Sequence, residues 1–225
     1  MGKLLLVLML SIPVMILSAT QGISAVNYTI ANSKGSRPWF DKEIGLKYAL
    51  DTMIKSTNFI WNIFDKNYRK TVNQVSLIFV DNMVGVADTN NDKIYVSASY
   101  IQGLGKEKKN EFTGIVYSQM TRVWQFNGNG KTPKKLLGGI ADFVRLKAGF
   151  ESASWVKPGG GEKWDESTNV TARFLAYYNY VMKGFVSQLN KNMTSRYTES
   201  FITDYLGLPM DQLWNGYQKN ASGHN

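Results

Sequence analysis

Residues 114–150, GIVYSQMTRVWQFNGNGKTPKKLLGGIADFVRLKAGF, decide the fold of this chain. A helix is expected over 106–126, because its apolar residues recur at three- and four-residue spacing: Phe112, Val116, Met120 and Val123. The segment 127–130, NGNG, tolerates positive φ and is expected to end that helix. A second helix is expected over 134–150, with Leu137, Ile140, Ala141, Val144 and Leu146 as its apolar positions.

A second stripe of the first helix is polar. Ser118, Arg122 and Gln125 follow one another at i, i+4 and i+7, so they share a face. A zinc-protease helix carries two histidines and a glutamate at the places of Ser118, Gln119 and Arg122. Neither histidine nor glutamate is present at these three places.

Further stretches, together with 114–150, resemble the plant basic secretory proteins, a secreted, defence-associated family with a zincin-like fold. They are VNYTIANS (26–33), NDKIYVSASYIQG (91–103), WVKPGGGEKWDESTNVTARFLAYYNY (155–180) and DYLGLPMDQLW (204–214). The resemblance covers nearly everything after residue 25. It implies one family domain over 26–225.

The family pattern has His-Glu-Met-Thr-His-Val-Trp-Gln on the first helix and Glu-Gly-Ile-Ala-Asp on the second. By that resemblance Ser118, Arg122 and Gly138 replace the metal ligands, and Gln119 replaces the catalytic base. Asp142, which would orient a ligand histidine, is the surviving member. An aspartate of the family's ARFLDY motif is also absent, because Ala176 stands there.

The amino-acid composition, apart from any resemblance, also argues against a zinc site. The chain has no cysteine and a single histidine, His224, so an ordinary nitrogen and sulfur zinc site cannot be assembled. We therefore expect no metal and no other cofactor. Ser118 lacks a histidine to act as its base, which argues against a serine nucleophile.

Asp142 has two candidate partners. We expect Arg122 to take the place of the lost metal and to pair with it, because an unpaired buried charge is unfavourable. The alternative is that Asp142 binds Arg145 or a backbone amide.

A former substrate cleft is expected beside the strand 93–97, which the resemblance places along it. Tyr95, Trp124 and Gln125 are the candidate cleft residues. Two structural alternatives stand: the strand is an ordinary edge strand, and Trp124 belongs to the core.

Residues 1–25 are predicted to be a cleaved signal peptide. Lys3 precedes the apolar segment 4–17, and Ala25 or Ala19 would mark the cleavage site. Secretion fits four candidate glycosylation sites, at Asn27, Asn169, Asn192 and Asn220. We expect an extracellular or cell-wall location, and no membrane span, since the apolar segment is short and Pro13 interrupts it.

The net charge of +9 suggests an acidic partner, with cell-wall polysaccharide or peptide as the candidates. Specific nucleic-acid binding is not expected, because no recognition motif is present.

The remaining elements predict an α+β fold, with a small mixed sheet, long helices and a helical C-terminal half. Strands are expected at 75–81, 84–87 and 93–97, and helices at 43–64, 170–189, 197–206 and 210–217. We expect a secreted, inactive peptidase homologue that binds peptide or glycan. An active zinc endopeptidase, or a hydrolase of another mechanism, is the alternative.

Overall fold

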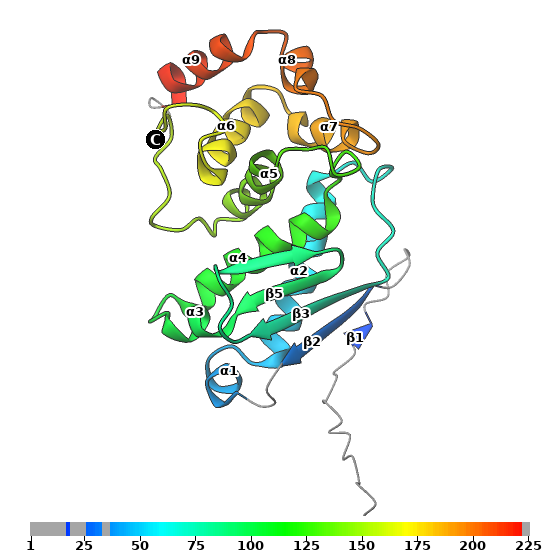
Figure 1. The fold of residues 1–225 in the computed structure, drawn as a ribbon, viewed down its shortest axis with the longest axis vertical. Helices are drawn as coiled ribbons and strands as arrows, with labels where there is room; N and C mark the ends of the chain where they lie inside the picture. Colours follow the sequence, from blue (N-terminus) through cyan, green and yellow to red (C-terminus); the bar gives the residue numbers. More distant parts are fainter. Residues whose placement is uncertain (1–16, 19–25, 33–36, 222–225) are drawn as a thin grey trace, which may run out of the picture.

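A five-stranded mixed sheet lies at one end of the molecule in the computed structural model, which describes residues 17–18, 26–32 and 37–221 (Figure 1). The strands are β1 (Leu17–Ser18), β2 (Asn27–Asn32), β3 (Gln74–Val80), β4 (Ala87–Asn90) and β5 (Lys93–Ser97). Their order is β1-β2-β3-β5-β4. The central pairs β2–β3 and β3–β5 are parallel, and the outer pairs are antiparallel.

One face of this sheet is buried by two long helices, α2 (Leu46–Ile63) and α4 (Lys108–Trp124), which lie behind it in Figure 1. Strand residues alternate between the faces, so every second side chain of β3 is buried: Val75, Leu77 and Phe79. Phe79 stacks on Phe112 of α4, with ring centroids 6.2 Å apart. Each such fully buried side chain contributes roughly 1.5–3 kcal/mol.

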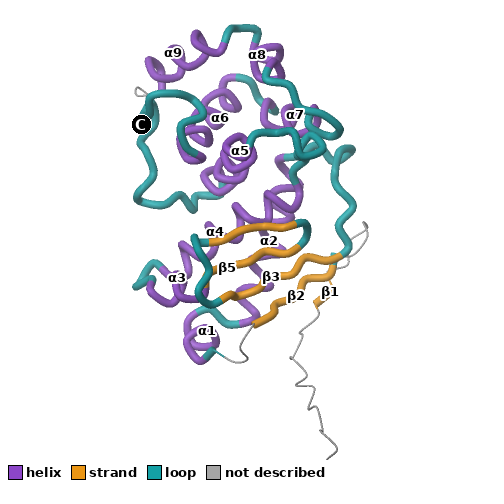
Figure 2. The backbone as a smooth tube through the Cα atoms, viewed as in Figure 1, coloured by secondary structure: helices purple, strands orange, loops and turns teal. Residues whose placement is uncertain are grey.

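The other half of the described chain is helical, as the purple tube of Figure 2 shows. Its helices are α5 (Lys134–Lys147), α6 (Thr168–Val181), α7 (Phe185–Asn192), α8 (Ser200–Leu206) and α9 (Met210–Ala221). Two short helices, α1 (Pro38–Glu43) and α3 (Ala98–Gly103), flank the sheet. The expected α+β class with a helical C-terminal half is confirmed.

Helices α5 and α6 pack closely because small residues face each other. A Cβ atom on Gly139 would lie 2.2 Å from Cγ2 of Thr171, and one on Gly138 would lie 2.4 Å from Cγ2 of Thr168. Only glycine fits at these two positions with the helices where they are. This close approach brings Thr168 next to α4 and α5.

Two expected helices are each divided in the structure. The helix expected over 43–64 breaks at Gly45, whose φ of 79° is left-handed, and the helix expected over 170–189 breaks at Gly184, whose φ is 85°. Strand β2 was not expected from the sequence.

The expected turn after the first helix is confirmed, because residues 128–130 all have positive φ after α4. In the β4–β5 hairpin, Asn91 also has a positive φ, of 52°.

The predicted signal peptide lies outside the described residues except for Leu17–Ser18, which pair with β2. No helix in the described part of the chain has the length and apolar character needed to cross a bilayer.

Candidate functional site

Ser118 and Asp142 join α4 to α5 at the place where the sequence predicted a degenerate metal site. The Ser118 Oγ donates a hydrogen bond of 3.1 Å to Oδ1 of Asp142. Ser118 is 6% exposed, and Thr168 at the start of α6 also hydrogen-bonds the same carboxyl. Three helices therefore meet at Asp142.

The pKa of Asp142 is raised above its usual value of 3.8. Burial, which disfavours the charged carboxylate, is the largest cause. The hydrogen bonds from Thr168 and Ser118, and the positive charges of Arg145 and Arg122, act in the opposite direction but are smaller. Asp142 is thus a carboxyl whose proton is held more tightly than in water.

Arg122 lies against Gly138, the position at which the family pattern has a glutamate. A Cβ atom on Gly138 would lie 3.1 Å from Nη2 of Arg122, so the guanidinium borders the space that a side chain at 138 would enter. The Nε of Arg122 is buried and has no hydrogen-bond partner among the residues that the structure describes. A permanent cation therefore stands between α4 and α5.

The direct ion pair expected between Arg122 and Asp142 is wrong. Within the described residues, the carboxylate contacts Ser118 and Thr168 instead, and Arg122 acts on it only through longer-range attraction. The physical reason is that Arg122 extends toward Gly138, where the absence of a side chain leaves room for it.

Arg145, the alternative partner, is also engaged elsewhere. Its Nη2 lies 2.8 Å from Oε2 of Glu111, and its Nε donates to the carbonyl of Phe150 at 2.6 Å. The guanidinium stacks over Trp155 at 5.2 Å and crosses close to Gly114. Its effect on Asp142 is likewise an attraction without direct contact.

Gln119, at the place of the catalytic base, links α4 to the edge of the sheet. Its Oε1 accepts a hydrogen bond of 2.8 Å from Oγ1 of Thr89 on β4. Gln119 is 8% exposed. An amide held in this way has neither the charge nor the pKa of a general base.

Two residues of the site, Thr89 and Thr168, were not expected from the sequence. Ser167 caps α6 by accepting a hydrogen bond from the Val170 amide, and that helix start is visible in the sequence. Nothing in the sequence indicates that Thr168 would reach Asp142. Thr89 carries no sequence signal at all.

The expected cleft residues lie elsewhere. Trp124 is 3% exposed, donates to Oγ1 of Thr57 at 3.3 Å and packs edge-on against Trp61, so it is a core residue. Gln125 is also buried, and its Nε2 donates to the carbonyl of Leu137. The expectation that these two side chains line a cleft is wrong, since both are buried in the interior of the protein.

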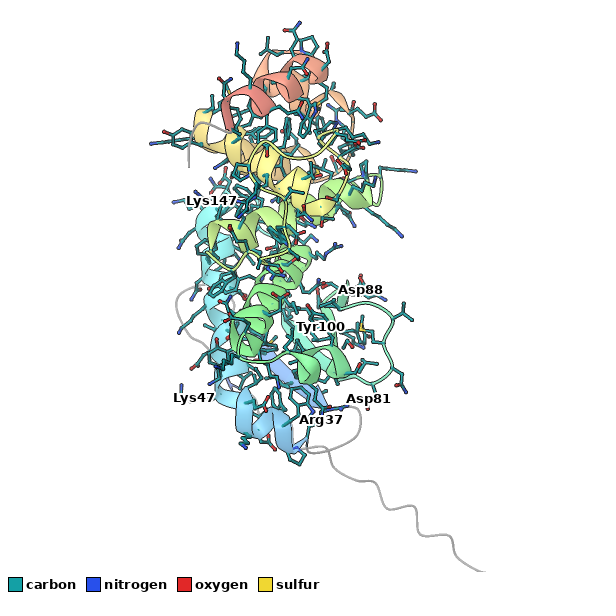
Figure 3. The ribbon with its side chains drawn as sticks, turned by 90° about the vertical axis from the view of Figure 1, so that its left-hand side faces the viewer. Arg37, Lys47, Asp81, Asp88, Tyr100 and Lys147 are labelled. Atoms are coloured by element: carbon teal, nitrogen blue, oxygen red, sulfur yellow. The ribbon has the colours of Figure 1, made fainter. Side chains whose placement is uncertain are left out.

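Tyr95 and its strand are a further correction. β5 is flanked by β3 on one side and β4 on the other, so it has no free edge for a peptide. Ile94 and Val96 face the helices, which places Tyr95 on the opposite face, away from Ser118. The edge strand beside α4 is β4, and Figure 3 labels Asp88 on it.

The candidate glycosylation sites occupy different elements. Asn27 in β2 and Asn220 in α9 are exposed, and Asn220 donates to the carbonyl of Gly216. Asn169 and Asn192 are half-buried, accepting hydrogen bonds from Ser167 and Gln188 respectively.

Most of the chain matches a known protein family. Residues 23–217 match the model of the BSP family, described as a peptidase of plants and bacteria. The chain belongs to this family. No curated protein sequence matches the chain.

Solved structures with the same fold are zinc metallopeptidases. A variant of an M1 zinc metallopeptidase from Deinococcus radiodurans is 10% identical, and the match covers 93% of this chain and 53% of that one, with a TM-score of 0.57. A second structure of the Deinococcus radiodurans enzyme is 9% identical, with coverages of 93% and 52% and a TM-score of 0.52. A two-domain M1 zinc metallopeptidase bound to L-arginine is 11% identical, with coverages of 92% and 52% and a TM-score of 0.53.

These likenesses concern the fold alone. The chain spans about half the length of each of these solved structures. The fold of this BSP-family chain is zincin-like, as the resemblance implied.

The residues at the site do not fit a zinc ion. A zinc site needs neutral imidazole, thiolate or carboxylate donors, and three protein ligands at least. Ser118 offers a hydroxyl engaged with Asp142, Arg122 offers a cation, and Gly138 offers nothing. Nowhere in the described part of the chain do three histidine, cysteine or carboxylate side chains come together to hold a metal.

Proposed function

We propose that this protein is a secreted BSP-family member that has lost peptidase chemistry and acts by binding peptide or glycan. The observation that carries the proposal is the position of Arg122. Its guanidinium borders Gly138, so a fixed positive charge stands where the family fold would place a metal ion and its glutamate. A cation there repels Zn²⁺ by ordinary electrostatics.

Peptide binding has a candidate surface in the edge strand β4. A strand at the edge of a sheet presents unpaired backbone groups, which an extended peptide can meet by adding one more strand. Thr89 of β4 is fixed to α4 through Gln119, which holds the strand in a defined position. We propose that a peptide lies along β4 without being cleaved. We infer that the protein acts outside the cell, in defence or in association with the cell wall.

Zinc content and proteolysis test the loss of activity. Purified mature protein, dialysed and then analysed for metals, is expected to carry no stoichiometric zinc. It is also expected not to hydrolyse casein, with or without added zinc. About one zinc per chain with chelator-sensitive hydrolysis would instead establish an active zinc endopeptidase. Hydrolysis that persists in chelator would indicate another mechanism.

Secretion is tested by mass. The secreted chain is expected to start after Ala19 or Ala25 and to lose mass on deglycosylation. Asn27 and Asn220, whose side chains are exposed, are the first sites to examine. A full-length, unglycosylated intracellular protein would contradict this part of the proposal.

A further inference from the structure

A pocket of about 350 Å³ opens among α6, α9, the end of α5 and the loop after Lys157. Three tyrosines, Tyr177, Tyr180 and Tyr217, and the guanidinium of Arg173 line it, with small apolar side chains between them. This volume is typical of a small-ligand site. The mixture of aromatic surface with one charged group is also typical of such sites.

The pocket is held in shape by hydrogen bonds to its loop. Tyr217 is 1% exposed, and its hydroxyl accepts a hydrogen bond of 2.9 Å from the Gly159 amide. Gln218 donates to the carbonyl of Gly161 at 3.0 Å, and Arg173 Nε donates to the carbonyl of Val156 at 3.1 Å. A preformed wall lowers the entropy lost when a ligand binds.

The rim presents an exposed aromatic ring. Tyr180 is 77% exposed, and the next two residues, Val181 and Met182, are 60% and 40% exposed. Clustered exposed apolar side chains are typical of interaction surfaces. A tyrosine combines a flat apolar ring with a hydroxyl, which suits a ligand with apolar C–H faces and a polar edge.

The charged group that lines the pocket is a cation. Among the described lining residues none is acidic, and Arg173 is ionised at neutral pH. Its Nη1 and Nη2 lie 3.5 and 3.3 Å from the oxygens of Glu151, whose side chain is 45% exposed. Strong charge-assisted bonds of this type are about 2.7–2.9 Å long, so Glu151 is a weak partner that a ligand carboxylate can displace.

Two lysines are sequence neighbours of lining residues. Lys147 follows Leu146 and Lys157 precedes Pro158, both of which are lining residues. In Figure 3, Lys147 lies in the helical half, on the opposite side of the view from Asp88 of β4. The pocket is therefore separate from the edge strand proposed to bind peptide.

We propose that this pocket binds an anionic saccharide, a sugar chain containing uronic acid units. The C–H face of a sugar ring packs on Tyr180 and Tyr177, and its carboxylate meets the guanidinium of Arg173 in a bidentate pair. Hydroxyl groups at the ring edge remain available to water and to the tyrosine hydroxyls. The proposal gives a location and a chemical class to glycan binding, and it does not depend on the state of the former metal site.

Calorimetric titration with a short oligomer of galacturonic acid, and with the matching neutral galactose oligomer, tests the proposal on the mature protein. The acidic oligomer is expected to bind, and the neutral one at least tenfold more weakly. Tyr180→Ala and Arg173→Gln are each expected to weaken acidic binding about tenfold or more. Arg173→Lys, which keeps the charge but loses the planar fork, is expected to fall between Arg173→Gln and the native protein.

Two control variants separate this pocket from general attraction to a basic protein. Tyr68→Ala removes a tyrosine of the loop before β3, and Lys42→Gln removes an exposed charge on α1. Both are expected to leave binding unchanged. Because Tyr180 is exposed, its replacement preserves the fold even if Arg173→Gln does not.

Several results would overturn the proposal. They are the absence of binding, equal binding of the neutral oligomer, an unchanged affinity in Tyr180→Ala, or an equal loss in Lys42→Gln. Competition by an oligomer of aspartate as strong as by the acidic sugar would also overturn it, by showing recognition of charge alone. Zinc content is a separate measurement, so failure here leaves the loss of peptidase chemistry untouched.

Discussion

Asp142 is a carboxyl that the fold buries among hydroxyl groups, and within the described part of the chain it has no direct cationic partner. Because its pKa is raised above 3.8, the folded protein holds this proton to higher pH than the unfolded chain does. The associated stability is present below about pH 3.8 and is lost as pH rises through the folded-state pKa. The direction follows from burial, the largest of the causes.

We predict that Asp142→Asn removes this pH dependence. The free energy of unfolding of the variant, relative to the native protein, is expected to increase from about pH 3.5 to pH 7. Urea unfolding at several pH values measures it. Ser118→Ala deletes a hydrogen bond to the carboxylate and should shift the transition to higher pH. The opposite trend in Asp142→Asn would mean that Arg122 and Arg145 outweigh burial.

The residues of this site show which contacts could be predicted from the sequence and which could not. It placed Ser118 and Arg122 on one helix face and Asp142 on the next helix, and the 3.1 Å hydrogen bond confirms that the two helices bring these positions together. The direction in which the Arg122 side chain extends was not predictable. It depends on the space above Gly138 and on Thr168, which comes from a third helix.

At the scale of elements, the packing of α5 against α6 depends on glycine. We predict that Gly138→Ala destabilises the protein by about 1–3 kcal/mol, because its Cβ meets Thr168 Cγ2 at 2.4 Å. This loss occurs although alanine favours a helix by about 1 kcal/mol over glycine. Thermal and urea unfolding measure it.

Thr168→Ser, which removes the Cγ2 atom, should recover most of that stability in the double variant. Gly103→Ala is the matched control, since nothing lies within 4 Å of a Cβ there. Equal effects of Gly138→Ala and Gly103→Ala would show that the helices separate without difficulty.

A second element-scale prediction concerns α4 and α5 at the Glu111–Arg145 pair. The two side chains are 15% and 8% exposed, with 2.8 Å between Oε2 and Nη2. Glu111→Gln leaves the buried guanidinium without its counter-charge, which is expected to reduce the free energy of unfolding by about 3–5 kcal/mol. Chemical denaturation measures the loss.

The surface pair Lys47–Asp51 of α2 provides the comparison. Asp51→Asn there should change stability by about 0–1 kcal/mol, because solvent screens an exposed pair. Similar losses for the two substitutions would mean that the Glu111 site is as well solvated as the surface of α2.

Elements with a clear internal pattern of apolar residues were predictable. The elements against which they pair in the sheet were not. The alternation in 93–97 predicted the bounds of β5 as the structure has them. Its place between β3 and β4 depends on partners elsewhere in the chain, so the strand was wrongly set beside the cleft. A short strand was also expected at 84–87, whereas β4 begins at Ala87.

At the scale of the whole molecule, a zincin-like fold is built by a chain whose residues at the site do not fit a zinc ion. The sheet with α2 and α4, and the helical half above them, hold Ser118, Arg122 and Gly138 together (Figure 1). The buried core extends through both the sheet and the helical half.

We predict that zinc binding returns when the four family residues are restored and the obstructing methyl group is removed. The variant combines Ser118→His, Gln119→Glu, Arg122→His and Gly138→Glu with Thr168→Ser. The fifth change is needed because Thr168 Cγ2 lies 2.4 Å from where the Cβ of residue 138 would stand. Removal of Arg122 also eliminates the positive charge, so about one zinc per chain is expected.

Elemental analysis and calorimetry measure that binding, and casein hydrolysis reports activity. The same variant with Thr168 retained is the matched control, and weaker zinc affinity is expected for it because the glutamate introduced at position 138 cannot enter without displacing α6. If neither variant binds zinc while both remain folded, then α4 and α5 no longer hold zincin geometry. If both bind equally, α6 moves aside easily and the threonine is no obstacle. Zinc binding without hydrolysis would mean that the surface proposed to bind peptide along β4 is also unsuited to catalysis. The restored ligands do not contact that surface.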